Sequence, residues 1–242
     1  MPNITGSATV GGINVYQSET VQSAPLGLRV AGSDGKEFRY VKAGASALVV
    51  GNVLQSPAYG TDHNALVVVS GTAGDYSVVV TLATAAVTKD QYAGGTMSIN
   101  VTPGLGQSYT IVGHPAQAST TGNVTLTLAE PLRTTLSTAT RVALKKCAYN
   151  GVIQSPVTTL TGSTVGIAVY AIPSGEYGWI QVKGLCSCLS DNSSIIMGSA
   201  VEVSLTVAGS IALAGTAAVW PIGIACQAKD STKVIVCDIM VL

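Results

Sequence analysis

The chain has 242 residues, 12 of them basic and 12 acidic, so it carries no formal net charge. Charged residues make up 10% of it, where an ordinary soluble domain has about 25%. This composition argues against a nucleic-acid binder, which needs a basic surface, and against a disordered chain, which combines high charge with low hydrophobicity. A length of 242 residues allows one large all-β domain or two smaller ones, with a sizeable core in either case.

Residues 1–27 are predicted to form an extended N-terminal arm. Two short strand-like runs, Thr9–Val15 and Thr20–Ser23, stand apart from each other and are flanked by glycine or proline. The sequence does not open with the basic start and apolar stretch of a secretory signal, so we expect no such signal.

A β-rich domain is predicted over residues 28–145. It opens with a strand at Phe38–Val41, and the apolar positions within Ala43–Gln55 suit one short helix. The predicted strand Asn123–Leu128 alternates apolar and polar residues strictly, which is typical of a strand with one buried and one solvated face. The strands separated by turn sequences are Leu66–Ser70, Tyr76–Leu82, Met97–Val101, Tyr109–Gly113 and Asn123–Leu128.

Residues 146–242 are predicted to form a second β-rich domain of paired hairpins. In the first hairpin a strand opens at Gly166 and returns along Tyr177–Lys183. In the second a strand opens at Gly223 and returns along Lys233–Met240. Both follow the same plan and have similar strand lengths, so we interpret them as related hairpins.

The stretch between Glu202 and Lys229 has no charged residue and is long enough to cross a bilayer. Glycines, polar residues and Pro221 interrupt it. Strands at Val203–Val207 and Ile211–Ala214 therefore describe it better, and we expect no membrane partner. Short strands spaced by turns along the whole chain predict an all-β fold, a β-sandwich or a barrel-like domain.

The five cysteines are expected to be free, buried and reduced. Cys186 and Cys188 are two positions apart, which fits neither a Cys-x-x-Cys redox motif nor a zinc half-site. Cys226 and Cys237 each lie in an apolar strand-like run. This usage favours folding in a reducing cytoplasm.

No catalytic, metal or cofactor site is predicted, and we do not expect an enzyme. His114 precedes a proline, where an imidazole usually bonds to the backbone of a turn, and His63 lies in a polar loop where it is expected to be solvated. The acidic residues are scattered, and neither a nucleophile elbow nor a phosphate-binding loop occurs.

One segment is locally basic in this weakly charged chain. Arg29, Lys36, Arg39 and Lys42 lie close together in the sequence, against few acidic residues. They are interpreted either as a solvated hairpin edge or as a docking surface for an acidic partner. The segment is the best charge-based candidate for a contact site.

A second candidate surface is an exposed aromatic face on the first return strand. Strand alternation places Tyr177 and Trp179 on one side, together with Gln181 and Lys183, and places Ile180 on the other. Exposed tyrosine and tryptophan platforms are typical of carbohydrate-binding modules.

Three stretches resemble structural proteins of tailed bacteriophages, in particular the small head decoration (cement) proteins. The first covers residues 35–44 and the apolar run Ala47–Gln55. The others run from Gly113-His114-Pro115-Ala116 into Asn123–Pro131, and from Gly166-Ile167-Ala168 through Tyr177–Gly184. The resemblance covers much of the chain from residue 28 onward.

This resemblance implies a non-enzymatic virion protein that decorates and stabilises the capsid exterior and folds in the cytoplasm of a bacterial host. It implies the major capsid protein and copies of the chain itself as partners, in a homotrimer or another homo-oligomer. It supplies no catalytic residues. No cofactor and no nucleic-acid partner are expected. The N-terminal arm is expected to extend across a neighbouring subunit and to order on binding.

Two alternatives remain open. A phage fibre or receptor-binding protein is also β-rich, but the sequence lacks the repeats or coiled-coil stalk that fibres usually show. A carbohydrate-binding β-protein would use exposed aromatic residues, for which Tyr177 and Trp179 are the candidates.

Overall fold

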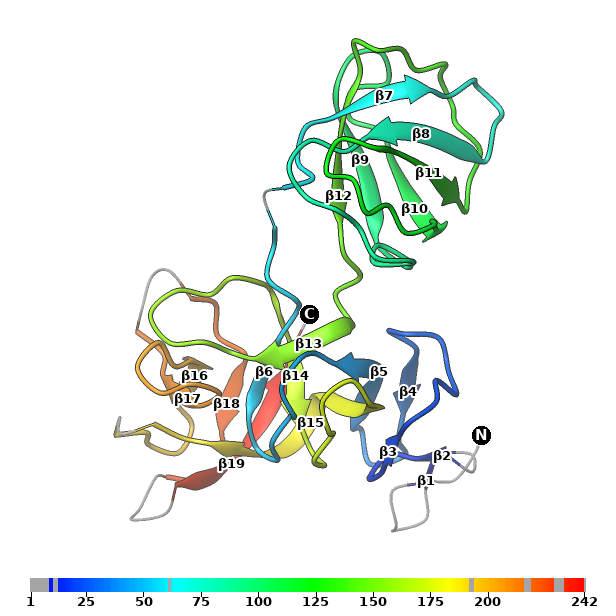
Figure 1. The fold of residues 1–242 in the computed structure, drawn as a ribbon. Coiled ribbons are helices and arrows are strands. Elements are labelled where there is room, and N and C mark those ends of the chain that lie inside the picture. Colours follow the sequence, from blue (N-terminus) through cyan, green and yellow to red (C-terminus); the bar gives the residue numbers. More distant parts are fainter. Residues whose placement is uncertain are drawn as a thin grey trace. The chain divides into compact units, whose positions relative to one another are not determined.

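The computed structural model describes residues 9–10, 13–60, 62–191, 194–215, 219–228 and 233–241. Every regular element among these residues is a β-strand, which confirms the all-β fold expected from the sequence (Figure 1). The chain divides into two compact units. Residues 1–57 and 148–242 form the larger unit, and residues 58–147 form the smaller one.

This division differs from the predicted domains at 28–145 and 146–242. β5 (Glu37–Ala43) pairs with β15 (Tyr177–Leu189), and β6 (Val53–Gln55) pairs with β14 (Thr164–Ala168). The early strands therefore share a sheet with the C-terminal ones, and the smaller unit is inserted between them. Pairing between strands so far apart in the sequence leaves no local signal.

The smaller unit is a closed barrel of six antiparallel strands. Neighbours follow the order β10, β11, β8, β7, β12 and β9, and β9 pairs again with β10. A closed barrel has no free strand edge, so its backbone groups are paired all the way around. The strands are β7 (Leu66–Ser70), β8 (Ser77–Thr81), β9 (Thr96–Val101), β10 (Ser108–Gly113), β11 (Asn123–Leu128) and β12 (Arg141–Lys145).

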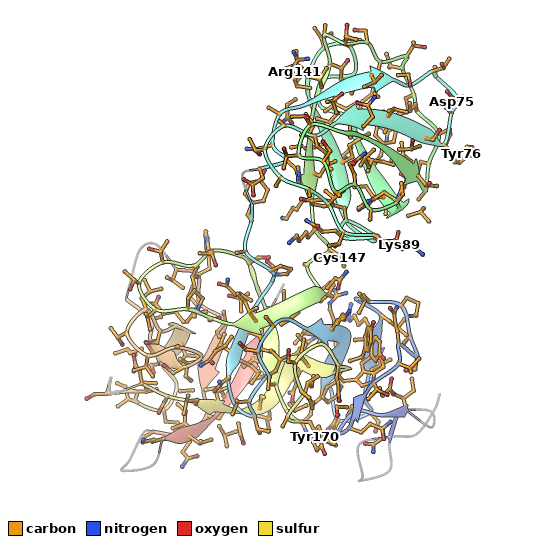
Figure 2. The ribbon with its side chains drawn as sticks, in the orientation of Figure 1. Asp75, Tyr76, Lys89, Arg141, Cys147 and Tyr170 are labelled. Carbon is orange, nitrogen blue, oxygen red and sulfur yellow. The ribbon has the colours of Figure 1, made fainter. Side chains whose placement is uncertain are left out.

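The five strands predicted in this part of the chain match β7 to β11 to within one residue at each end. In β11 exposed and buried residues alternate along the whole strand, as predicted. Val124, Leu126 and Leu128 point inward and join an apolar core to which all five of the other barrel strands also contribute residues. The turn between β7 and β8 lies at the barrel surface, where Figure 2 labels Asp75 and Tyr76.

The larger unit is built on one sheet in the order β17, β16, β18, β19, β15, β14, β6, β13, β5 and β4. Because β15 also pairs with β5, the strands β15, β14, β6, β13 and β5 are linked in a closed ring. Val41, Leu54 and Ile180 belong to the apolar core that these strands share. The remaining strands are β4 (Arg29–Ala31), β13 (Asn150–Gln154), β16 (Ala200–Val203), β17 (Ile211–Leu213), β18 (Gly223–Ala225) and β19 (Val234–Met240).

Both predicted hairpins are confirmed. β14 pairs antiparallel with β15, and β18 pairs antiparallel with β19. Beyond the ring, β15 pairs with β19 from Lys183 opposite Met240 to Leu189 opposite Val234, so the two hairpins are neighbours (Figure 1, yellow and red). The turn at residues 229–232 lies outside the described residues. β16 ends at Val203, where the sequence predicted a strand to begin.

The first strand of each hairpin contains a glycine that lies against the partner strand: Gly166 is inside β14, and Gly223 begins β18. A Cβ atom at Gly166 would lie 2.6 Å from the carbonyl oxygen of Gln181. A Cβ atom at Gly223 would clash in the same way with the carbonyl oxygen of Asp238. Only glycine allows this close approach of two backbones.

The described part of the predicted N-terminal arm is folded against the sheet and is not extended. β1 (Thr9–Val10) and β2 (Ile13–Asn14) pair as a short hairpin, and β3 (Ser18–Glu19) pairs with the start of β15. Val15 is fully buried in a cluster with Phe38. The prediction of an extended arm is therefore wrong for these residues, and residues 1–8 and 11–12 lie outside the described part.

The Glu19 carboxylate links the N-terminal segment to β5 through hydrogen bonds. The Tyr40 hydroxyl donates a hydrogen bond of 2.6 Å to Glu19 Oε2, and the Ser23 hydroxyl donates to the same oxygen. Burial alone raises the pKa of Glu19, but hydrogen bonds from Ser23, Tyr40 and Gln17 outweigh it and lower the pKa overall. Burial, followed by the bond to Glu19, raises the pKa of Tyr40.

The helix predicted within Ala43–Gln55 is also wrong. β5 ends at Ala43, Leu48 forms an isolated bridge with Ile172, and β6 begins at Val53. Between them Gly51 has a φ of 82°, which a helix does not allow. Of the apolar residues that suggested one face of a helix, Val53 and Leu54 lie in β6, whereas Val49 begins a turn and is 55% exposed.

Candidate contact surface

The four basic residues predicted as a contact site do not form one patch. Arg29 on β4 lies directly opposite Arg39 on β5, so these two share one face of the sheet. Lys42 lies an odd number of positions from Arg39 and its ammonium sits 5.4 Å from the centre of the Tyr177 ring, on the other face. Lys36 pairs with Asp34 in the turn, at 3.0 Å. The alternation of a strand separates the cations.

Arg29 and Arg39 instead line a pocket of about 290 Å³ with residues from the C-terminal strands. Arg29 forms an ion pair with Glu37 at 2.5 Å, and Lys183 approaches the same carboxylate at 3.6 Å. Arg39 donates a hydrogen bond of 2.9 Å to the carbonyl oxygen of Gly27. We call this site the cationic pocket; its lining is Arg29, Glu37, Arg39, Val182, Lys183, Met240 and Val241.

The cationic pocket has an excess of positive charge, because three cations surround one carboxylate. The hydrogen bond from Arg29, aided by the nearby charge of Lys183, lowers the pKa of Glu37. Glu37 therefore stays ionised at neutral pH, and two positive charges remain without a carboxylate inside the pocket. Such a site attracts an acidic group.

Strict alternation predicted that Lys183 shares one face of β15 with Trp179 and Gln181, away from the face that carries Arg39. The register of β15 against β5 shifts between Gln181 and Lys183, so Lys183 lies opposite Glu37. The shift is an irregularity of the bulge type, which reverses the alternation beyond it. A sequence read with strict alternation cannot show this reversal.

The predicted exposed aromatic face is wrong. Trp179 is 2% exposed, and its ring meets that of Tyr40 edge-on at 5.1 Å between ring centres. Tyr177, which is half-buried, stacks on Tyr40 at 6.1 Å. The aromatic face was placed correctly on one side of the strand, but the segment around Val15 covers it.

Beyond the bulge, the face of the sheet that carries Lys183 and the cationic pocket also carries exposed apolar side chains. Lys183 lies opposite Met240, while Leu185 and Ile224 both lie opposite Asp238, one on each side. Directly opposite residues in an antiparallel pair point to the same face. Leu185, Met240 and Ile224 are 54%, 62% and 54% exposed. We call Leu185, Ile224 and Met240 the apolar strip; Asp238 lies among them.

The two histidines are structural residues of the barrel. His63 was expected to be solvated but is 3% exposed; its Nε2 donates to the carbonyl oxygen of Ala85 at 2.9 Å, and its Nδ1 accepts from the Tyr92 hydroxyl at 2.6 Å. His114 bonds to backbone, as predicted: Nδ1 donates to the carbonyl oxygen of Pro115 at 2.9 Å and Nε2 accepts from the Tyr92 amide at 3.1 Å.

The cysteines are free, as predicted, and four of the five are buried. Cys226 is the exception, because it is exposed at the end of β18. Hydrogen bonds with Cys186 and Cys237, together with burial, raise the pKa of Cys188. This thiol therefore stays protonated inside the core.

Within the described ranges, no group of three or more His, Cys, Asp or Glu side chains is placed to hold a metal ion. In the same ranges, no helix is long and apolar enough to span a membrane. Comparison with protein-family models, curated proteins and solved structures finds no match for this chain.

Proposed function

We propose that the chain is a non-enzymatic structural protein of a tailed-phage particle, where it decorates the capsid exterior and stabilises it. In this proposal it folds in the host cytoplasm, and its partners are the major capsid protein and further copies of itself. The resemblance of residues 35–44, 113–131 and 166–184 to head decoration proteins supports this assignment.

The observation that carries the proposal is the exposed apolar side chains on both units. In the larger unit, Ile196, Met197 and Trp220 are 66%, 72% and 89% exposed. In the barrel, Leu105 and Val112 are 65% and 57% exposed. Exposed apolar side chains in a chain with 10% charged residues are typical of a surface that partners cover in an assembly.

The carbohydrate-binding alternative loses its predicted platform, because Trp179 is buried. Trp220 is exposed, but it lies on a separate segment before β18. A single exposed tryptophan also suits a protein contact, since tryptophan is enriched among the interface residues that contribute most of the binding energy. The structural role is therefore the better account of this surface.

Co-sedimentation with phage particles tests the proposal. We expect the purified chain to bind particles that lack it, to saturate at a fixed number of copies per shell, and to raise the temperature at which the shells break. Failure to bind such particles, together with binding to a glycan array, would favour the carbohydrate-binding alternative and overturn the proposal.

A further inference from the structure

The cationic pocket and the apolar strip are continuous, because Met240 belongs to both. Lys183 lies at the edge of the pocket directly opposite Met240, and Asp238 lies two residues further along β19. The outer face of β15, β19 and β18 therefore presents a group of cations, then the exposed side chain of Met240, and then Asp238 with Leu185 and Ile224 on its two sides.

Asp238 is an unusual residue for an exposed apolar surface. It lies between Leu185 and Ile224, the residues directly opposite it on the two neighbouring strands. Across the described parts of the chain, Asp238 forms no ion pair. The cationic pocket has the opposite imbalance, since its three cations share the single carboxylate of Glu37. One face thus holds an excess of positive charge in the cationic pocket and a carboxylate without an ion pair at Asp238, with Met240 between them.

We propose that this face binds the same face of a second copy of the chain, around a twofold axis that passes near Met240. A twofold axis reverses the order of features in the partner. Asp238 of each copy then meets the cationic pocket of the other, and the apolar side chains of the two strips cover each other. The contact removes apolar area from water and places each Asp238 carboxylate against the excess positive charge of the other copy's pocket.

Other partners fit this face less well. A purely acidic surface would neutralise the pocket but place carboxylates against Asp238. A purely basic surface would pair with Asp238 but place cations against Arg29, Arg39 and Lys183. Juxtaposed like charges disfavour both contacts. The face needs a partner with both signs in reversed order, and its own copy has that pattern.

This inference does not depend on the proposed function, because it concerns the isolated chain. Its first test is the mass of the full chain in solution, measured by sedimentation over a range of concentrations. We expect an even number of copies for the wild type. We expect Asp238→Lys to halve the mass, because the new cation faces the cationic pocket of the partner. Asp238→Asn should give a smaller loss of association.

A second test probes the twofold axis directly. In a Cys226→Ser background, we expect the Met240→Cys variant to form a covalent pair under mild oxidation, since the two copies of this position lie close together at the axis. Val112→Cys in the same background is the matched control, because Val112 is 57% exposed but lies on the barrel. Each variant is first compared with the wild type by circular dichroism.

Four outcomes overturn the inference. These are a wild-type chain that stays monomeric at every concentration, an assembly with an odd number of copies, an Asp238→Lys chain that keeps the wild-type mass, and a Met240→Cys chain that cross-links no faster than the Val112→Cys control. Binding to phage particles is measured separately, so failure of this contact leaves the proposed function testable on its own.

Discussion

At the scale of single residues, Tyr92 links the two buried histidines of the barrel. Its hydroxyl donates to His63 Nδ1 and its backbone amide donates to His114 Nε2. Both imidazoles are buried, and each uses both ring nitrogens. Two histidines that are well separated in the sequence therefore belong to one hydrogen-bonded cluster, and that cluster is structural.

Tyr92→Phe removes one hydroxyl and leaves a buried ring nitrogen of His63 without its donor. We expect the free energy of unfolding to fall by about 1–3 kcal/mol, the usual cost of an unsatisfied buried polar group. Chemical denaturation of the full chain measures this loss. Tyr76→Phe is the control, because Tyr76 is 57% exposed and its variant should unfold like the wild type. Equal stability of all three chains would contradict the structural role of Tyr92.

At the scale of strands, the sequence predicted best where each strand alternates apolar and polar residues over its own length. β11 is the clearest case, since its alternation and its bounds were both correct. The prediction failed where a residue's face depends on another strand. Trp179 is buried by the segment around Val15, and Lys183 changes face at a bulge. Ala43–Gln55 is not helical, because Leu48 and β6 pair with distant strands.

The candidate contact surface was predictable only in part, for the same reason. Arg29 and Arg39 are lining residues of the pocket and were identified from local charge. Met240 and Asp238 were not, because nothing in their own segment shows that β19 lies beside β15. Only the register between the strands brings the cations, the apolar side chains and the carboxylate onto one face.

The glycine at the start of β18, Gly223, gives a prediction for the sheet. Gly223→Ala forces a Cβ atom against the carbonyl oxygen of Asp238, so the two strands must move apart. We expect a loss of about 1–3 kcal/mol, as for other overpacked sites. Gly215→Ala is the control, because no atom lies within 4 Å of its Cβ position. If the two variants unfold at the same denaturant concentration, the close approach of β18 and β19 is refuted.

The Glu19 carboxylate gives a pH dependence to the packing of the N-terminal segment. Its pKa is lower in the folded chain than the ordinary value of 4.5, so the folded state binds fewer protons in this range. The stabilisation is therefore complete above the ordinary value and is lost as the pH falls through the folded pKa. We expect Glu19→Gln to lower stability at pH 7 by about 1 kcal/mol and to weaken the fall towards pH 3.

Denaturation of both chains at a series of pH values measures this difference. Glu176→Gln is the matched control, since the Glu176 side chain forms no hydrogen bond or ion pair among the residues that the structure describes. A Glu19→Gln chain whose stability follows the wild-type pH curve would show that the carboxylate does not hold this segment.

At the scale of the whole molecule, the chain consists of two units with separate cores. The barrel of residues 58–147 is closed and has its own apolar cluster. The larger unit is completed by strands from both sides of this insertion. The charged-residue content of 10% and the exposed apolar side chains of both units support the proposed role, in which the chain acts through contacts with protein partners.

The closed barrel is expected to fold without the rest of the chain. A fragment of residues 58–147 should show a β-type circular dichroism spectrum and a cooperative thermal transition, because its core and all its strand pairings are internal. Rejoining the flanking residues 1–57 and 148–242 with a short linker is the complementary variant. A fragment that remains unfolded would contradict the division into two units.

The most direct test of the proposed role is electron microscopy of purified phage particles that carry the gene for the chain. The account predicts density for the 24.4 kDa chain at regularly repeated positions over the outer surface of the shell. Particles from a phage without the gene should lack this density and break at lower temperature. Shells that are bare in the wild type, or density confined to fibres at the tail, would contradict it.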